Sequence, residues 1–181
     1  MRALGMIELV SIPRGIKVAD EMLKAANVAL VSATAVCAGK YIVIVSGDVA
    51  AVKSSVESGE IIADEKIVDS MVIANVHDGV IGALTASSDV EDIKALGIIE
   101  TFSLCAAVLA SDAMVKAANV QLIEVRLGRG LGGKSFITLT GEISAVESAV
   151  AVMDELEEVK GLVSGCEVIA SPHPDLFEAI Y

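Results

Sequence analysis

The stretch GMIELVS at residues 5–11 decides the fold, because it returns as GIIETFS at residues 97–103. A second stretch, DEMLKAANV at residues 20–28, returns as DAMVKAANV at residues 112–120. Both pairs are 92 residues apart (97 − 5 and 112 − 20), and 11 of the 24 positions compared from Gly5 onward are identical. One unit has therefore been duplicated and fused, so the chain consists of two related domains.

The separation between the two copies grows along the chain. Gly39 matches Gly133 at an offset of 94 (133 − 39), so the second copy has two additional residues between Val120 and Gly133. His77 matches His173 at an offset of 96 (173 − 77). The copies differ most in the loop before Gly39 and Gly133, and loops are where we expect function to differ.

The composition indicates a protein with a large surface to bury. Apolar residues make up 54% of the chain and the mean hydropathy is +0.70. No stretch approaches the roughly 20 apolar residues of a membrane helix. A subunit interface is the simplest place to hide such surface.

Charge and cysteine content narrow the choice of partners and compartment. The net charge is −12, only 3% of residues are aromatic, and no cluster of Lys and Arg stands out. Nucleic-acid surfaces need basic patches and stacking platforms, so we expect neither nucleic acid nor a membrane as a partner. Three cysteines without a CxxC pair fit the reducing bacterial cytoplasm.

Hydrophobic periodicity predicts the element order β-α-β-β-α-β-α in both copies. Ser11 and Asp48 are predicted to cap the first two helices, the second of which should end at Gly59. Two helices on one face of a four-stranded antiparallel sheet make an α+β, ferredoxin-like sandwich. The first copy is expected to contain strands 3–10, 28–36, 41–46 and 66–74 and helices 13–26, 48–58 and 79–85. The second is expected to contain strands 95–102, 120–127, 135–140 and 166–170 and helices 105–118, 142–156 and 174–180. The predicted domains are 1–90 and 93–181, with a polar hinge at 87–92.

Three motifs resemble the bacterial microcompartment (BMC) shell-protein domain. They are GMIEL at 5–9, KAANV at 24–28 and GKYIVI at 39–44, each with a partner in the second copy. The resemblance covers essentially the whole chain, as two complete domains in the unpermuted element order. It implies a structural protein rather than an enzyme, located in a microcompartment shell. Tandem-domain members form pseudohexameric homotrimers that tile laterally with other shell proteins.

The resemblance also implies a role for the matched helix ends. In the shell family, the lysine of this motif lies at the tile edge and packs against its counterpart on the next tile. That position falls on Lys24 and Lys116, each followed by an asparagine, Asn27 and Asn119. A cation near a helix C-terminus is the plain structural reading of the same residues.

The loop of Val36, Cys37, Ala38 and Gly39 resembles that of tandem-domain shell proteins from propanediol-utilisation compartments. Those proteins hold an iron–sulfur cluster on the central axis with one cysteine per subunit. The resemblance implies one [4Fe–4S] cluster per trimer, held by three Cys37 thiolates, for electron transfer or cluster exchange across the shell. An encapsulated redox enzyme would then be a partner. The family usually has proline where this chain has Ala38. We expect the amides of Ala38 and Gly39 to donate hydrogen bonds to the cluster sulfurs.

The cluster reading has three alternatives. Cys37 is a small buried apolar residue, or it lines an open trimeric pore for metabolites or cofactors. In the third alternative the chain is a ferredoxin-like small-molecule sensor. For Cys105 and Cys166 we expect core packing.

The stretch GRGLGGKS at residues 128–135 satisfies the phosphate-binding pattern GxxxxGK[ST]. That pattern binds phosphate only where a helix follows, and here a predicted strand follows, so we do not expect nucleotide binding. We predict instead a second glycine-rich loop at the ring centre, at the rim of the pore or bracing the cysteine loop. Its candidate residues are Arg126, Arg129, Gly130, Gly132 and Gly133.

The remaining polar residues offer little chemistry. His77 and His173 each precede a short predicted helix without a second ligand at metal-binding spacing, so a capping or a surface role is preferred to metal binding. Glu8 and Glu100 have no paired carboxylate that would form an acid/base dyad.

Overall fold

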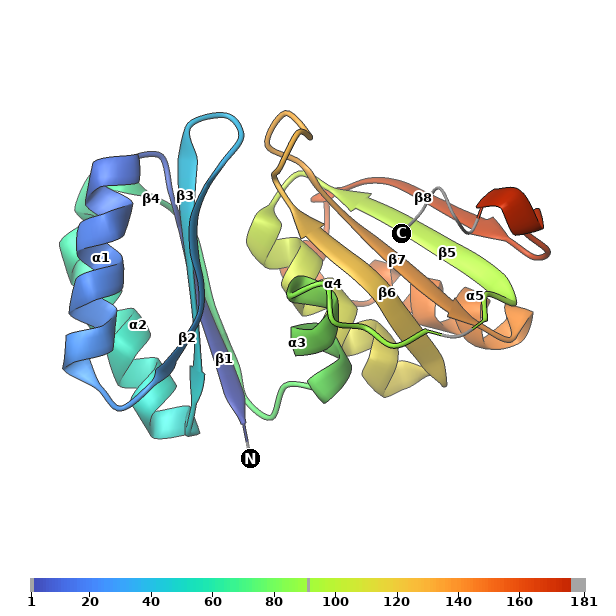
Figure 1. Cartoon of the computed structure of the whole chain (residues 1–181), viewed down its shortest axis with the longest axis horizontal. Coiled ribbons are helices and arrows are strands. Elements are labelled where there is room, and N and C mark those ends of the chain that lie inside the picture. Colours follow the sequence, from blue (N-terminus) through green and yellow to red (C-terminus); the bar gives the residue numbers. More distant parts are fainter. Residues whose placement is uncertain (1, 91, 177–181) are drawn as a thin grey trace. The chain divides into compact units, whose positions relative to one another are not determined.

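The structure is a computed structural model that describes residues 2–90 and 92–176. It divides into two compact units, Met1–Val76 with Gly128–Gly133, and His77–Leu127 with Lys134–Tyr181. Each unit contains one four-stranded antiparallel sheet with helices packed on it (Figure 1). The predicted α+β fold is therefore confirmed, while the domain bounds 1–90 and 93–181 stay a prediction.

The first unit has the strand order β2-β3-β1-β4. Strand β1 is an inner strand of this sheet. It pairs with β3 on one side, where Leu4 lies opposite Ser46, and with β4 on the other, where Leu4 lies opposite Ile73. Helices α1 and α2 cover one face of the sheet (Figure 1). Their buried side chains form one core with the sheet, which includes Ile7, Val18, Met22, Val43 and Val52. The elements are β1 (Ala3–Leu9), α1 (Ile12–Ala25), β2 (Ala29–Val36), β3 (Lys40–Gly47), α2 (Val49–Ala63), a 3-10 turn (Asp64–Lys66) and β4 (Ile67–Ile73).

The second unit repeats this topology with the strand order β6-β7-β5-β8. Even the irregularities recur: the β2–β3 pairing shifts register between Leu30 and Ser32, and the β6–β7 pairing shifts between Leu122 and Glu124. The elements are α3 (Asp78–Leu84), β5 (Ala95–Thr101), α4 (Leu104–Ala117), β6 (Val120–Leu127), β7 (Ser135–Gly141), α5 (Ile143–Ala151), two 3-10 turns (Val152–Asp154 and Glu157–Val159) and β8 (Val163–Ile169).

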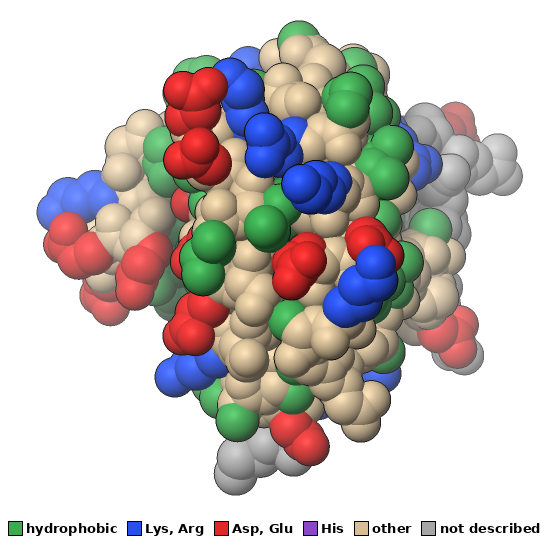
Figure 2. All heavy atoms as spheres, turned by 90° about the vertical axis from the view of Figure 1, so that its left-hand side faces the viewer, with side chains coloured by type: hydrophobic (Ala, Val, Ile, Leu, Met, Phe, Trp, Pro, Cys, Tyr) green, Lys and Arg blue, Asp and Glu red, His purple; other side chains and the backbone are tan. Residues whose placement is uncertain are grey.

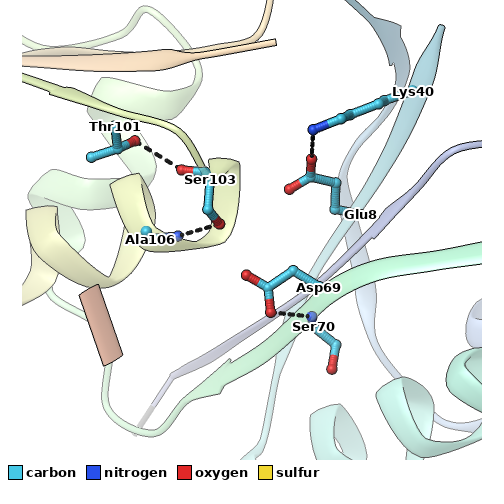
Figure 3. A network of polar contacts seen from close by, with 7 residues as sticks. All are labelled: Glu8, Lys40, Asp69, Ser70, Thr101, Ser103 and Ala106. Atoms are coloured by element: carbon cyan, nitrogen blue, oxygen red, sulfur yellow. Dashed lines mark hydrogen bonds and ion pairs between the residues drawn. The ribbon is translucent and has the colours of Figure 1, made fainter. Parts of the chain in front are cut away.

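The helix starts follow the predicted capping only in part. The Ser11 hydroxyl accepts a hydrogen bond from Arg14 N at the start of α1, as predicted. Ser103 does the same for Ala106 N at the start of α4, with a distance of 3.1 Å (Figure 3). Asp48 occupies the N-cap position of α2, as predicted, but its side chain makes no capping hydrogen bond.

Helix α2 also continues past Gly59, where it was predicted to end. A Cβ at Gly59 would lie 2.6 Å from Ile7 Cδ1 and 2.7 Å from Met22 Cγ. Gly59 is therefore explained by the close approach of α2 to the sheet and α1, and the helix runs on to Ala63.

Two later elements differ from prediction as well. Helix α5 ends at Ala151, before the predicted 156, and two 3-10 turns follow it. Strand β8 begins at Val163, three residues before the predicted start. The predicted helix 174–180 lies mostly outside the described residues.

Candidate functional site

Cys37 lies in the short loop that joins β2 to β3 in the first unit. Val36 is buried, Cys37 is half-buried, and Ala38 and Gly39 are exposed. Gly39 has a φ of +78°, a conformation that glycine adopts without steric cost, so the loop can turn directly into β3. The loop thus holds a cysteine at the surface, at the end of a rigid hairpin.

A second loop, Gly128–Gly133, groups with the first unit and lies against Cys37. The backbone N–H of Cys37 donates a hydrogen bond to Gly128 O at 3.0 Å. The backbone N–H of Gly130 donates to Cys37 Sγ at 3.3 Å. A Cβ at Gly133 would lie 3.6 Å from Cys37 O, so these backbones also pack closely. The two loops that the sequence indicated separately therefore meet at Cys37.

The second loop depends on glycine for its shape. Gly128, Gly130, Gly132 and Gly133 have φ values of +67°, +72°, +62° and +92°. Other L-residues adopt this left-handed region only at a steric cost. The glycines therefore let the longer loop of the second copy fold back onto Cys37.

The two arginines of this region have different surroundings. Arg129 Nη2 donates a hydrogen bond to Thr34 Oγ1 in β2 at 3.2 Å, which ties the glycine loop to the hairpin that carries Cys37. Arg126 lies on β6, pairs with Glu124 at 2.7 Å, and stacks over the ring of Phe136 at 4.9 Å. Arg129 thus contacts the cysteine hairpin, whereas Arg126 contacts the sheet of the second unit.

A repeated ion pair escaped the sequence analysis. Lys40 Nζ lies 2.6 Å from Glu8 Oε1 (Figure 3). Its counterpart, Lys134 Nζ, lies 2.8 Å from Glu100 Oε2. The signal was available, because both members of each pair are matched between the copies. Since Lys134 binds a carboxylate and β7 follows it, the phosphate-binding pattern has neither the helix nor the lysine that it needs.

The carboxylate of Glu100, the counterpart of Glu8, has a lowered pKa. Hydrogen bonds from Lys134 and then Ser164 lower the pKa of Glu100. The Ser164 hydroxyl lies 2.6 Å from Glu100 Oε2. Glu100 is therefore held as an anion, which fits an ion-pair role.

The other two cysteines have different environments. Cys105 is buried in α4, as predicted. The prediction of core packing for Cys166 is wrong, because Cys166 is exposed on β8, an edge strand whose outer side has no neighbouring strand. Although the residue is exposed, its sulfur is partly desolvated at the rim of a pocket, which raises the pKa of the Cys166 thiol, and the carboxylates of Glu167 and Asp154 raise it further.

Both histidines act as helix caps, as predicted. His77 Nδ1 accepts a hydrogen bond from Gly79 N at 3.1 Å, and His173 Nδ1 accepts one from Asp175 N at 3.3 Å. Within residues 2–90 and 92–176, no three His, Cys, Asp or Glu side chains gather closely enough to hold a metal ion.

The matched lysines lie in the last turns of equivalent helices. Lys24 pairs with Asp20 in α1, and Lys116 pairs with Asp112 in α4. The hydrogen bond that the Lys24 ammonium donates to Asp20 raises the pKa of Lys24, so the ammonium stays charged. Asn119 follows α4, and Asn27 follows α1, where it lines a pocket of about 470 Å³ together with Arg2 and Asp48.

The sheet of the second unit has one open face. A pocket of about 640 Å³ lies on it, opposite the face that packs against the helices. The Thr138 hydroxyl lies in this pocket, is 4% exposed as a residue, and has no hydrogen-bond partner among the described residues. Such a group is costly unless something else covers and satisfies it. The lining includes Ile98, Glu100, Arg126, Phe136, Thr138 and Ile169.

Comparison with known proteins gives this arrangement a family. The model of the BMC domain matches residues 3–76 and 95–172, so the chain belongs to the BMC-domain family. A solved structure of a microcompartment protein from Desulfitobacterium hafniense DCB is 48% identical, covers 98% of this chain and 99% of its own, and has a TM-score of 0.92.

The relatives specify the class further. The chain is 39% identical over 176 residues to the bacterial microcompartment shell protein PduT of Citrobacter freundii, across 97% of this chain and 96% of that protein. PduA of the same organism, also named a shell protein, is 44% identical over 84 residues, which is 46% of this chain and 87% of PduA. The chain is thus a tandem-domain microcompartment shell protein similar to PduT. None of the helices among its described residues has the length and apolar character to span a membrane.

Proposed function

We propose that this chain is a structural component of a microcompartment shell that assembles as a homotrimer and holds a [4Fe–4S] cluster between three copies of Cys37. Its location in a shell follows from the family and from relatives named as shell proteins. The trimer and the cluster are supported by separate observations.

The first copy exposes its helix face and the second copy exposes its sheet face, and this difference supports the trimer. On α1, Ile16 is 56% exposed, whereas its counterpart Val108 on α4 is 0% exposed. In the sheets the order reverses: Met6 in β1 is 0% exposed, while its counterpart Ile98 lines the open pocket. On the side of the molecule that carries α1 and α2, hydrophobic side chains lie at the surface between charged ones (Figure 2).

These two surfaces suit each other. The helix face left open in the first copy has the same place in the repeat as the helix face buried in the second. We infer that the exposed apolar helix face of one chain covers the open sheet face of the next, where the Thr138 hydroxyl has no hydrogen-bond partner among the described residues. Such a head-to-tail contact is heterologous, and a ring of three chains with six domains closes it.

Replacing Ile16 by glutamate should break the trimer. Burying an unpaired carboxylate costs several kcal/mol, so we expect the dissociation constant to rise by about a hundredfold or more. Light scattering coupled to size exclusion would show smaller species with unchanged circular dichroism. The matched control is Ser54→Glu, at an exposed position of α2. An Ile16→Glu protein that remains trimeric at micromolar concentration would contradict this interface.

The chemistry around Cys37 supports the cluster. The residue is half-buried, its sulfur accepts an amide N–H at 3.3 Å, and no other cysteine shares its loop. A soft thiolate with a backbone donor directed at sulfur suits an iron–sulfur ligand. Because each chain supplies one such group, three chains would supply three of the four thiolates that a [4Fe–4S] cluster normally takes.

Bound in this way, a cluster would supply one-electron transfer at the centre of the shell tile, with one iron open to a further ligand. The direct test is anaerobic purification, followed by an iron assay, a visible spectrum and native mass spectrometry. We expect about four iron atoms per trimer. A colourless, iron-free trimer after cluster reconstitution would overturn the cluster and favour an open pore for small metabolites.

The edges of the tile are a separate prediction. Lys24 and Lys116 are exposed at equivalent helix ends, with stems that can cover apolar surface on a neighbouring tile. We expect the double variant Lys24→Ala, Lys116→Ala to remain trimeric but to form few or no sheets by electron microscopy. The pair Lys66→Ala, Lys160→Ala removes two other surface ammonium groups and should leave sheet formation unchanged. Normal sheets from the first variant would exclude an edge role.

A further inference from the structure

The loop Gly128–Gly133 contains the feature that the proposed function leaves unexplained. It carries the two additional residues of the second copy. It also matches a phosphate-binding sequence pattern, but a strand follows it in place of the helix that phosphate binding needs. Yet four of its glycines adopt positive φ values, which orient their amides in directions that ordinary loops do not allow. One of those amides, from Gly130, is directed at Cys37 Sγ at 3.3 Å.

Residue 130 must be glycine because of its backbone conformation and not because of close packing. A Cβ at Gly130 would meet nothing within 4 Å, so glycine is not required there for space. The φ of +72° is what requires it, and this conformation directs the amide to the sulfur. Gly132 has a φ of +62° and equally open space, but it has no such contact in the described structure. It therefore serves as a matched control.

Two further contacts fix the donor in place. Cys37 N–H donates to Gly128 O, and Arg129 Nη2 donates to Thr34 Oγ1. The thiol and its donor are thus held together by two further bonds, made by the two residues that precede Gly130. The amides of Ala38 and Gly39 are predicted to donate to the sulfurs of a bound cluster, and this stays a prediction. The amide that donates to Cys37 Sγ is that of Gly130, which the second copy supplies.

We propose that the glycine-rich loop of the second copy positions and tunes the sulfur of Cys37 through the Gly130 N–H. The positioning of the sulfur stands on the observed contact alone. The tuning rests on the proposed function, because the tuned group is the proposed cluster ligand. The hydrogen bond fixes the direction of Sγ, and it withdraws electron density from sulfur. It therefore favours the electron-rich, reduced cluster and raises the reduction potential.

The first test removes the donor from the cluster-bearing trimer. An ester placed at residue 130, through the α-hydroxy analogue of glycine, replaces the N–H by oxygen and keeps the glycine backbone freedom. The same replacement at residue 132 is the control. We expect the midpoint potential in a redox titration to become more negative for the ester at 130 and to stay unchanged for the ester at 132. Equal shifts in both variants would overturn the tuning role.

The second test needs no cluster. In the reduced, iron-free protein labelled with ¹⁵N-glycine, Cys37→Ala should move the Gly130 amide proton upfield and speed its exchange about fivefold. The Gly132 amide should not change. An unchanged Gly130 resonance would refute the hydrogen bond even if iron binds. Conversely, a protein that shows the Gly130 response but binds no iron would refute the cluster and leave the positioning contact standing.

Discussion

Replacing Cys37 by alanine should abolish iron binding and leave the trimer intact. The residue is half-buried in a loop, so removing one sulfur atom leaves only a small cavity and little change in stability. The chemical loss is much larger, because each chain offers a single thiolate and three are lost together in the trimer. We expect iron per trimer to fall from about four to background, together with the visible absorbance.

The control for this experiment is Cys166→Ala. Cys166 is exposed on β8, and its thiol pKa is raised, which disfavours the thiolate that a cluster needs. This variant should therefore keep wild-type iron content. Iron retained by Cys37→Ala, or lost from Cys166→Ala alone, would place the cluster elsewhere or remove it from the protein.

The second large effect concerns the repeated ion pair. Glu8 is 0% exposed and Lys40 partly buried, so Lys40→Met removes the cation beside a buried carboxylate. Breaking a buried pair in this way costs about 3 kcal/mol. In the second copy the side chains of Glu100 and Lys134 are 41% and 40% exposed. There the loss should be below about 1 kcal/mol, because water screens the carboxylate that is left.

Urea denaturation of both variants measures this difference directly. The double variant Glu8→Gln, Lys40→Met should recover part of the loss, because it removes the buried charge that the single variant leaves behind. Equal destabilisation by Lys40→Met and Lys134→Met would show that the contribution of the ion pair to the free energy of unfolding does not depend on its burial.

The sequence predicted the framework well because local periodicity and the repeat reinforce each other. The element order along the chain and the Ser11 cap are short-range or repeated features, so two copies of each signal were available. The predicted end of α2 at Gly59 is wrong, because this glycine serves a close contact of α2 with β1 and α1 that no local pattern encodes. The prediction for Cys166 is wrong for a similar reason, since exposure depends on which edge of the sheet its strand occupies.

The contact at the candidate site was beyond sequence reasoning for a different reason. Cys37 and Gly130 are 93 residues apart, and they belong to the segments in which the copies differ most. Comparison of the copies therefore indicated that both loops matter, but it gave no sign that they touch. By contrast, the pairing of Glu8 with Lys40 was legible, because both members recur as Glu100 and Lys134.

The contact between Gly130 and Cys37 also bears on how such a protein can evolve. A shell built from separate single-domain subunits would have to match a cysteine-bearing type to a glycine-loop type in equal numbers around each ring. In this chain one polypeptide carries both, so each Cys37 is made together with its Gly130 donor in a fixed ratio. Fusion thereby frees the two halves to drift apart in sequence, and a change in one loop can be compensated in the other within the same polypeptide.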